Sequence, residues 1–389
     1  MLLRSTSLLP ILTPLMLLAC KGDPVPPKSP PPAASAQASA PLGPPASADS
    51  AVQAPGRPAA ASHQELAFVG LALPGATGPV TLDYIAYDPT RRRVWVPVGD
   101  TGSVDVFDIA KAAFARVDGF KTAEREVRGK KRMLGPSAVA IGDGFAYVGD
   151  RASSEVCPVD LATLALGTCL RLSSPTDGVA FVASAHEVWV TTPHDHSIAV
   201  LDASKAGSLT PKTSVRFAGS PEGFAVDPVR GVFFTNLEDQ NKTVLVDIAT
   251  HQPKTSFSLD CGPDGPRGVA VDARRDFVFV ACTDHVAILD AGHAGAKLGT
   301  IDTGAGVDNI DWLEGKELLY VAAAKAAKLT VARVDDRGQG GVVAAGASAQ
   351  GARNAVADAD GNAYVADPGG ARILSFALGN SAVTSPLKE

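Results

Sequence analysis

One short segment places imidazole and carboxylate groups side by side. It reads His194-Asp195-His196 and is followed by Ser197. Imidazole and carboxylate groups are ligands for divalent metal ions, and both can act in acid–base catalysis. The two histidines would point the same way along an extended segment, but a turn would separate them. Two alternatives therefore stay open, a metal or acid–base site and a solvated polar turn.

Several enzyme and binding classes are disfavoured by the same sequence. It contains no GxSxG elbow, no phosphate-binding loop and no GxGxxG that opens a helix. The net charge is -6 and the pI is near 5.7, which argues against a nucleic-acid binder held by a basic face. Aromatic residues make up only 6% of the chain, so platforms that stack single-stranded bases are not expected either.

The elements that must position these groups come from an internal repeat. One pattern recurs seven times, at intervals of 40 to 54 residues. Each copy has a short apolar strand, a turn, a second strand with an aromatic residue, a polar tip, and a third strand. A further apolar stretch between copies supplies a fourth strand. This predicts an all-β chain, a seven-bladed β-propeller with four-stranded blades. Residues 66–73 resemble the fourth strand that the last copy lacks, so we expect this N-terminal strand to close the last blade.

Some copies resemble known propeller repeats. VWVPVGDTGSVDVFDIA, VWVTTPHDHSIAVLDAS and VFFTNLEDQNKTVLVDIAT resemble the YVTN-type repeat of YncE-like proteins, and NAYVADPGGARILSF resembles the related NHL repeat. The resemblance covers about residues 65–380. Such propellers include binding scaffolds, lactonases and lyases, so the resemblance implies a fold and not one function.

The mouth of the central channel is the expected site. In a propeller, the loops that enter the first strands share a face with the tips that join second and third strands. The residues that begin the seven first strands should line this mouth. They are Asp83, Ser137, Asp177, Glu222, Arg267, Asp308 and Arg353. All of them except Ser137 are candidate ligand-binding residues. Each arginine lies between two acidic neighbours and should neutralise them, whereas Asp177 has no adjacent cation in the ring.

A divalent cation, calcium or magnesium, is the cofactor that this mouth could hold. The candidate ligands are Asp177, Glu222, His194 and His196. Gluconolactonase-like propellers hold calcium at the mouth through Glu and Asn or Asp, and the resemblance implies these parts for Glu222, Asp177 and Asp308. Asn309 and Asn354, however, follow ring positions without occupying them. Virginiamycin-lyase-like propellers use a histidine and magnesium on this face, but their motif does not align with this sequence.

Four cysteines fall within the repeats. A hairpin turn centred on Thr163 brings Cys157 opposite Cys169, within bridging range. Cys261 enters the fifth copy, and Cys282 ends its second strand. We predict disulfides 157–169 and 261–282, with buried free thiols as the alternative. A zinc site is disfavoured because no CxxC spacing occurs.

The connection between the first two copies is long and basic. Residues 119–136 contain Lys121, Arg125, Arg128, Lys130, Lys131 and Arg132. The segment should lie on the face of the mouth, where it could bind an anion or an acidic partner, or fold over the acidic residues. A solvated charged loop is the third alternative.

The N-terminal sequence predicts a signal peptide for export from the cytoplasm. Residues 1–19 combine Arg4 with an apolar run and end before Cys20 in a sequence that resembles a bacterial lipobox. A plain secretory signal is the alternative. Lys21 follows the cysteine, which favours the outer membrane. Residues 20–63 would be a lipidated cysteine and a disordered tether rich in Pro, Ala and Ser, residues 64–380 the propeller, and 381–389 a tail.

These observations predict a lipid-anchored, extracytoplasmic, monomeric protein that is held at the membrane only by its anchor. Its propeller would act as a binding scaffold for an envelope protein or a small ligand through the channel mouth. A metal-dependent lactonase-like hydrolase or lyase that uses the acidic mouth residues is the alternative. No nucleic-acid partner is expected.

Overall fold

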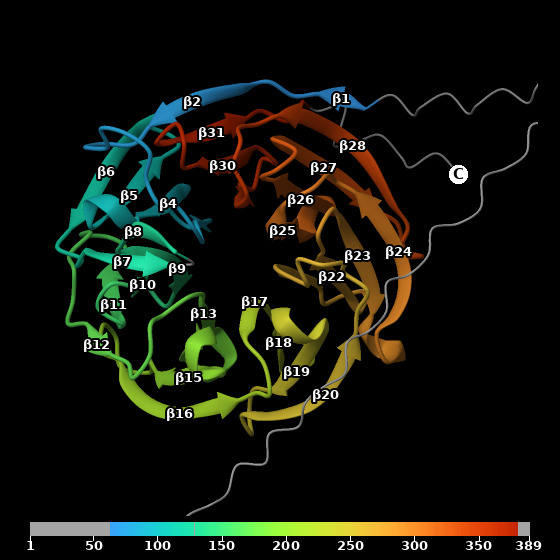
Figure 1. The fold of residues 1–389 in the computed structure, drawn as a ribbon, viewed down its shortest axis with the longest axis horizontal. Helices are drawn as coiled ribbons and strands as arrows, with labels where there is room; N and C mark the ends of the chain where they lie inside the picture. The colour runs from blue at the N-terminus through green and yellow to red at the C-terminus, as the bar shows by residue number, and fades with distance from the viewer. Residues whose placement is uncertain (1–62, 128, 380–389) are drawn as a thin grey trace, which may run out of the picture. The chain divides into compact units, whose positions relative to one another are not determined.

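Seven sheets are arranged in a ring around a central axis in the computed structural model of the chain (Figure 1). The structure describes residues 63–127 and 129–379. The predicted signal peptide, Cys20, the tether up to residue 62 and the tail at 381–389 lie outside the described residues. Each sheet is one blade, so the predicted seven-bladed β-propeller is confirmed.

Blades 1 to 4 follow one another along the chain, each with its inner strand first. Blade 1 contains β3 (Ala86–Asp88), β4 (Arg93–Val98), β5 (Ser103–Asp108) and β6 (Ala113–Asp118). Blade 2 contains β9 (Pro136–Gly142), β10 (Phe145–Asp150), β11 (Glu155–Asp160) and β12 (Leu170–Arg171). Blade 3 contains β13 (Val179–Val182), β14 (Glu187–Thr192), β15 (Ser197–Asp202) and β16 (Thr210–Arg216). Blade 4 contains β17 (Pro221–Asp227), β18 (Val232–Leu237), β19 (Lys242–Asp247) and β20 (Gln252–Ser258).

Blades 5 to 7 complete the ring. Blade 5 contains β21 (Val269–Asp272), β22 (Phe277–Ala281), β23 (His285–Asp290) and β24 (Ala296–Asp302). Blade 6 contains β25 (Val307–Leu313), β26 (Leu318–Ala323), β27 (Lys328–Val334) and β28 (Gly340–Ala347), and β1 (Gln64–Glu65) joins it. Blade 7 contains β29 (Ala355–Ala357), β30 (Ala363–Asp367), β31 (Arg372–Phe376) and β2 (Phe68–Ala72).

Short 3-10 turns and one extra hairpin connect these strands. The turns are η1 (Gly99–Thr101), η2 (Ala183–Ala185), η3 (Pro193–Asp195), η4 (Glu238–Gln240), η5 (Ala291–His293) and η6 (Glu314–Lys316). The hairpin consists of β7 (Ala123–Val127) and β8 (Lys130–Leu134) and lies between blades 1 and 2.

The core lies between neighbouring blades. Second strands such as β14 are buried along their whole length, because both of their faces pack against an adjacent blade. Trp189 of blade 3 stacks on Phe233 of blade 4 with ring centroids 4.7 Å apart. The outer strands β16 and β20 are largely exposed. Apolar second strands and polar outer strands therefore follow from the position of each strand in its blade.

An N-terminal strand closes the ring, as predicted. β2 pairs antiparallel with β31 as the fourth strand of blade 7, with Phe68 opposite Phe376. Their ring centroids are 5.6 Å apart. The structure adds a contact that the repeat did not predict: β1 pairs parallel with β28 as a fifth strand of blade 6. The segment that closes the ring thus bridges two blades.

Deletion of residues 1–73 should destabilise the propeller, whereas deletion of residues 1–62 should leave its thermal midpoint unchanged. The longer deletion removes the buried side chains of Leu66 and Leu73, each of which contributes about 2–5 kcal/mol when buried. It also exposes the edge of β31, which favours aggregation. Circular dichroism melting and size-exclusion chromatography measure both effects. Equal midpoints for the two deletions would contradict the assigned closure.

Candidate functional site

The channel mouth gathers the predicted charged residues at the entry to the inner strands. Arg353 donates to Asp83 Oδ1 at 3.3 Å, and its Nε lies 3.1 Å from Asp308 Oδ2. Burial raises the pKa of Asp308, and the neighbouring Arg353 opposes that shift. The expectation that Arg353 bridges acidic neighbours on both sides is therefore met by the geometry.

Close approach of the inner strands keeps the mouth narrow. Glycine follows the mouth residue in three consecutive blades, at Gly178, Gly223 and Gly268. A Cβ on Gly223 would lie only 2.1 Å from the carbonyl oxygen of Arg267. The amide of Gly268 donates to the carbonyl of Asp308 at 2.9 Å, which ties adjacent inner strands together. A larger residue at these positions would push the blades apart, so the repeat needs glycine here.

Arg151 supplies a cation that the sequence analysis missed. Its Nη2 lies 3.2 Å from Asp83 Oδ2 and also donates to Asp177. The sequence analysis found no cation beside Asp177 within the ring, and Arg151 supplies one from outside the ring. Arg151 directly follows β10, at the tip between the second and third strands, whereas the expected ring counted only residues that begin first strands. Burial nevertheless raises the pKa of Asp177, and Arg151 opposes that shift.

Arg267 pairs with a carboxylate that was also missed. Its Nη2 lies 2.7 Å from Oε1 of Glu238, which begins η4 at the tip of blade 4. The expected neighbours of Arg267 still act on it, since its charge opposes the raised pKa of both Glu222 and Asp308, but its ion pair is with Glu238. Burial, the charge of Asp177 and a hydrogen bond with Glu238 raise the pKa of Glu222 far above its usual range. Glu222 is therefore protonated at neutral pH.

Two aromatic rings cross the channel beneath these charges. Tyr84 of blade 1 stacks on Phe224 of blade 4, with centroids 5.8 Å apart and an interplanar angle of 24°. A Cβ on Gly178 would lie 2.2 Å from the Phe224 ring, so glycine makes room for it. Burial and the surrounding carboxylates raise the pKa of Tyr84. The site thus consists of the charged side chains of the mouth and, next to them, two stacked aromatic rings.

The histidine segment lies apart from the charged side chains of the mouth. His194 and His196 are both exposed at the η3 tip of blade 3, and Asp195 Oδ1 accepts a hydrogen bond from Ser197 at 3.0 Å. Within residues 63–127 and 129–379, no three His, Cys, Asp or Glu side chains form a group that could hold a metal ion. The four predicted metal ligands are therefore not brought together, and the solvated turn describes the histidines better.

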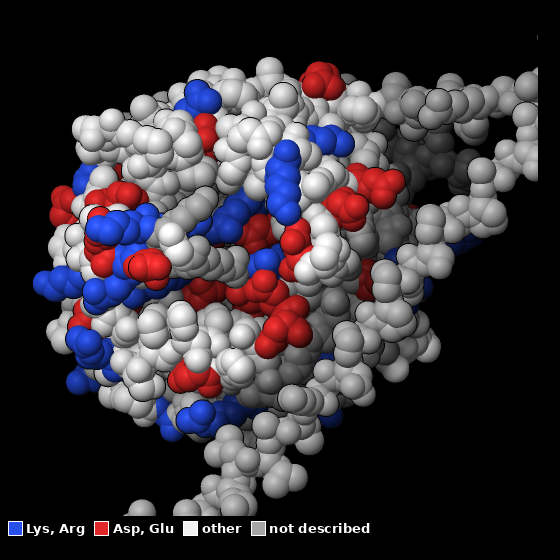
Figure 2. All heavy atoms as spheres, viewed as in Figure 1, with Lys and Arg blue, Asp and Glu red and all other residues white. Residues whose placement is uncertain are grey.

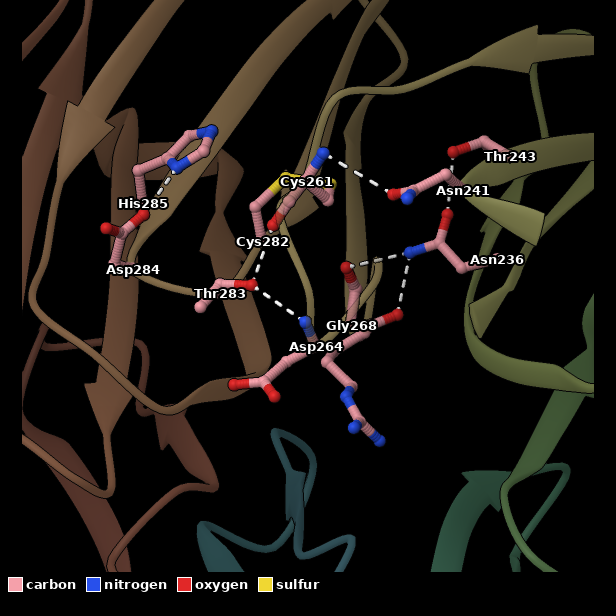
Figure 3. Close-up of a disulfide and its surroundings, with 11 residues drawn as sticks. Asn236, Asn241, Thr243, Cys261, Asp264, Gly268, Cys282, Thr283, Asp284 and His285 are labelled. Atoms are coloured by element: carbon pink, nitrogen blue, oxygen red, sulfur yellow. Dashed lines mark hydrogen bonds and ion pairs between the residues drawn. A yellow bond between two sulfur atoms is a disulfide. The ribbon is translucent and has the colours of Figure 1, made fainter. Parts of the chain in front are cut away.

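Both predicted disulfides are present, and one of them shapes the mouth. Cys157 bonds Cys169, and Cys261 bonds Cys282. Figure 3 shows the second bond beside Thr283, whose Oγ1 donates to the carbonyl of Cys261 at 2.7 Å. These contacts fix the loop that carries Arg267 into blade 5.

The disulfides also indicate the environment of the protein. Two such bonds indicate an oxidising, extracytoplasmic compartment. No helix in the described part of the chain is long and apolar enough to cross a membrane.

Positive side chains gather beside the mouth. Figure 2 shows Lys and Arg on the left of this face, where Figure 1 places the hairpin β7–β8, and Asp and Glu along the hollow at the centre. Within the described residues, the predicted basic loop contains the hairpin β7–β8, and Arg128 lies outside the described residues. None of its described side chains pairs with a carboxylate of the mouth. The geometry thus gives no support to the alternative in which it folds over the acidic residues.

Comparisons with known proteins identify the fold alone. No protein-family model matches this sequence, and neither does any curated protein. A chain of the mitotic checkpoint complex is similar with a TM-score of 0.63 and 13% identity, over 84% of this chain and 96% of that one. Virginiamycin B lyase from Staphylococcus aureus is similar with a TM-score of 0.61 and 12% identity, over 81% of this chain and 100% of that one. A streptogramin B lyase is similar with a TM-score of 0.60 and 10% identity, over 81% of this chain and 98% of that one. These similarities support a propeller, and no family match accompanies the resemblance to YVTN and NHL repeats.

Replacement of Arg151 by alanine should cost about 3–5 kcal/mol of unfolding free energy, because it leaves the partly buried Asp177 without its ion-pair partner and Asp83 with Arg353 as its one remaining arginine. Calcium should partly restore the stability of this variant and have little effect on the native chain, whose carboxylates already have a cation. Thermal denaturation with and without calcium measures both effects. Arg92→Ala, which breaks an exposed ion pair with Asp360, is the matched control and should cost under about 1 kcal/mol. Strong stabilisation of the native chain by calcium would contradict this assignment.

The protonated state of Glu222 predicts a pH dependence of stability. An unfolded glutamate loses its proton above about pH 4.3, whereas folded Glu222 retains it because its pKa is raised. The free energy of unfolding should therefore fall as pH rises from about 5 to 9, by up to about 1.4 kcal/mol per pH unit. Glu222→Gln removes this contribution, so its melting temperature relative to the native chain should rise steadily with pH. The exposed Glu314→Gln is the control for loss of one carboxylate, and a constant difference for both variants would disprove the proposed protonation.

Proposed function

We propose that this protein is a membrane-tethered, extracytoplasmic scaffold that binds a partner protein on the face of the channel mouth. One observation carries this proposal: the three aspartates of the mouth each contact an arginine. Asp83 and Asp177 share Arg151, and Asp308 is paired with Arg353. A group held in this way is a poor nucleophile or general base, because it must give up a buried partner to react.

The second pair of acidic residues leads to the same conclusion. Glu238 is paired with Arg267, and Glu222 is protonated beside it. The mouth is therefore a rigid, largely self-neutralised surface whose side chains are held in fixed positions. Rigid surfaces suit recognition, because little conformational freedom is lost on binding.

The distribution of charge across this face also supports binding to a protein. Lys and Arg are concentrated at the side that carries the hairpin, and Asp and Glu are concentrated along the hollow at the centre, although both signs also occur elsewhere on this face (Figure 2). Separated patches of opposite sign orient a partner and select against wrong ones.

The proposed attachment to the membrane rests on the disulfides and on the N-terminal sequence. The disulfides agree with an exported chain, and the lipobox-like sequence before Cys20 supports a lipid anchor, with Lys21 favouring the outer membrane. The segment up to residue 63 would then hold the propeller away from the bilayer.

The alternative, a metal-dependent lactonase-like hydrolase or lyase, has less support. Two of the similar structures are lyases, but at 10–12% identity they share only the fold. The residues that the alternative requires do not form a metal-ligand group within the described chain.

Site-specific photo-crosslinking in cells tests the binding face. A photoreactive residue at His194 or Ala326, both exposed at tips on the mouth face, should give an adduct with one and the same protein. The same residue at Val229 or Glu314, exposed in turns on the opposite face, should give none. Mass spectrometry of the adducts identifies the partner. Equal adducts from both faces, or none from either, would disprove the proposed face.

A further inference from the structure

The hairpin β7–β8 has two faces with different electrostatics. Cross-strand partners in an antiparallel pair point to the same side of the sheet. One side carries Glu124 opposite Met133 and Glu126 opposite Lys131. Lys131 Nζ also lies 2.8 Å from Glu124 Oε1. This side of the hairpin therefore carries two carboxylates and one lysine, and that lysine is paired.

The other side carries two arginines directly opposite each other. Arg125 faces Arg132 across the strands, and both are exposed. Neither makes a hydrogen bond or ion pair with any residue that the structure describes. Like charges placed directly opposite one another destabilise an antiparallel pair. This pair therefore weakens the isolated hairpin and leaves two guanidinium groups side by side without an anion.

The base of the hairpin is anchored, so the arginines are presented in a defined place. Thr81 Oγ1 donates to the carbonyl of Met133 at 3.2 Å, and the amide of Lys121 donates to Asp150 Oδ2 at 2.8 Å. Gly135 lies against the tip of blade 1, where a Cβ would come within 2.1 Å of the Gly99 carbonyl. Anchoring of this kind lowers the conformational cost of binding.

We propose that Arg125 and Arg132 form the docking site for an acidic segment of the partner protein. This inference rests on the proposed function and deepens it by naming the chemistry that the partner must supply. Each guanidinium group can hold a carboxylate by two parallel hydrogen bonds, and carboxylates between the two arginines would relieve their repulsion.

A protein segment fits this site better than an anionic membrane does. Asp and Glu side chains occupy the centre of the same face (Figure 2), and the chain has a net charge of -6. A flat anionic surface that reached the hairpin would also approach the rest of this net-negative chain and be repelled. A narrow acidic segment that follows the hairpin avoids that approach.

Fluorescence anisotropy with the purified full chain and a labelled peptide of about ten glutamates tests this inference. Arg125→Gln/Arg132→Gln should weaken binding about tenfold or more, since contacts of this charged kind contribute roughly a factor of ten each. Lys121→Gln/Lys131→Gln removes the same charge from the same segment and is the matched control, with an expected change of about twofold or less. A labelled glutamine peptide and vesicles that contain anionic lipid should not bind.

Each other outcome has a definite meaning. Equal losses in the two double variants would overturn the assignment, because general charge would then explain binding, and so would tighter binding to anionic vesicles than to the peptide. The arginine variant should melt at the same temperature as the native chain or higher, so loss of binding cannot come from unfolding. Glutamate binding without crosslinks from His194 would mean that the scaffold proposal fails and the hairpin site stands. Crosslinks from His194 without binding of the glutamate peptide would mean that the scaffold proposal stands and the hairpin site fails.

Discussion

Neutralisation of charge in a narrow, poorly solvated space is the constraint on which the mouth of this propeller depends. The inner strands approach so closely that Gly223 has no room for a side chain beyond its Cα. Carboxylates placed at the ends of these strands are therefore near one another and partly cut off from water, where an unpaired charge is expensive. The structure meets this constraint with Arg151, Arg267 and Arg353, and with a proton on Glu222. The three arginine contacts each cross a boundary between blades.

The same constraint links the closure of the ring to the site. The mouth exists only if all seven inner strands are held at a fixed distance, and this requires a ring without a free edge. β2 supplies the last strand of blade 7, and β1 extends the contact to blade 6. The disulfide between Cys261 and Cys282 acts more locally, because it fixes the loop that delivers Arg267. Ring closure sets the width of the mouth, and the disulfide sets the position of one of its cations.

Features that follow the repeat could be predicted from the sequence. Features that depend on the length, direction or burial of a side chain could not. The repeat predicted the blades and the closing strand, and strand spacing predicted both disulfides, because these follow from local pattern. It also placed Arg353 between Asp308 and Asp83 correctly. Arg151 and Glu238 were missed because they lie at strand tips, where the length and direction of a side chain decide which ring residue it meets. Protonation of Glu222 follows from burial, which no spacing of residues reveals. The tips are predicted on the mouth face, so charged tip residues were a signal that could have been used.

The arginines of the mouth are already paired, so the positive charge that binds an acidic partner must come from residues outside the channel. The arginines of the mouth are each occupied by a carboxylate inside the ring, so an incoming acidic group would have to displace an existing buried partner. Arg125 and Arg132, which have no partner among the residues that the structure describes, lie opposite each other in the hairpin outside this ring. A long connection between blades 1 and 2 is the simplest way to add such groups, since it changes no strand of the ring. The propeller therefore separates two tasks: charges at the axis stabilise the ring, and charges on the inserted hairpin remain available for recognition.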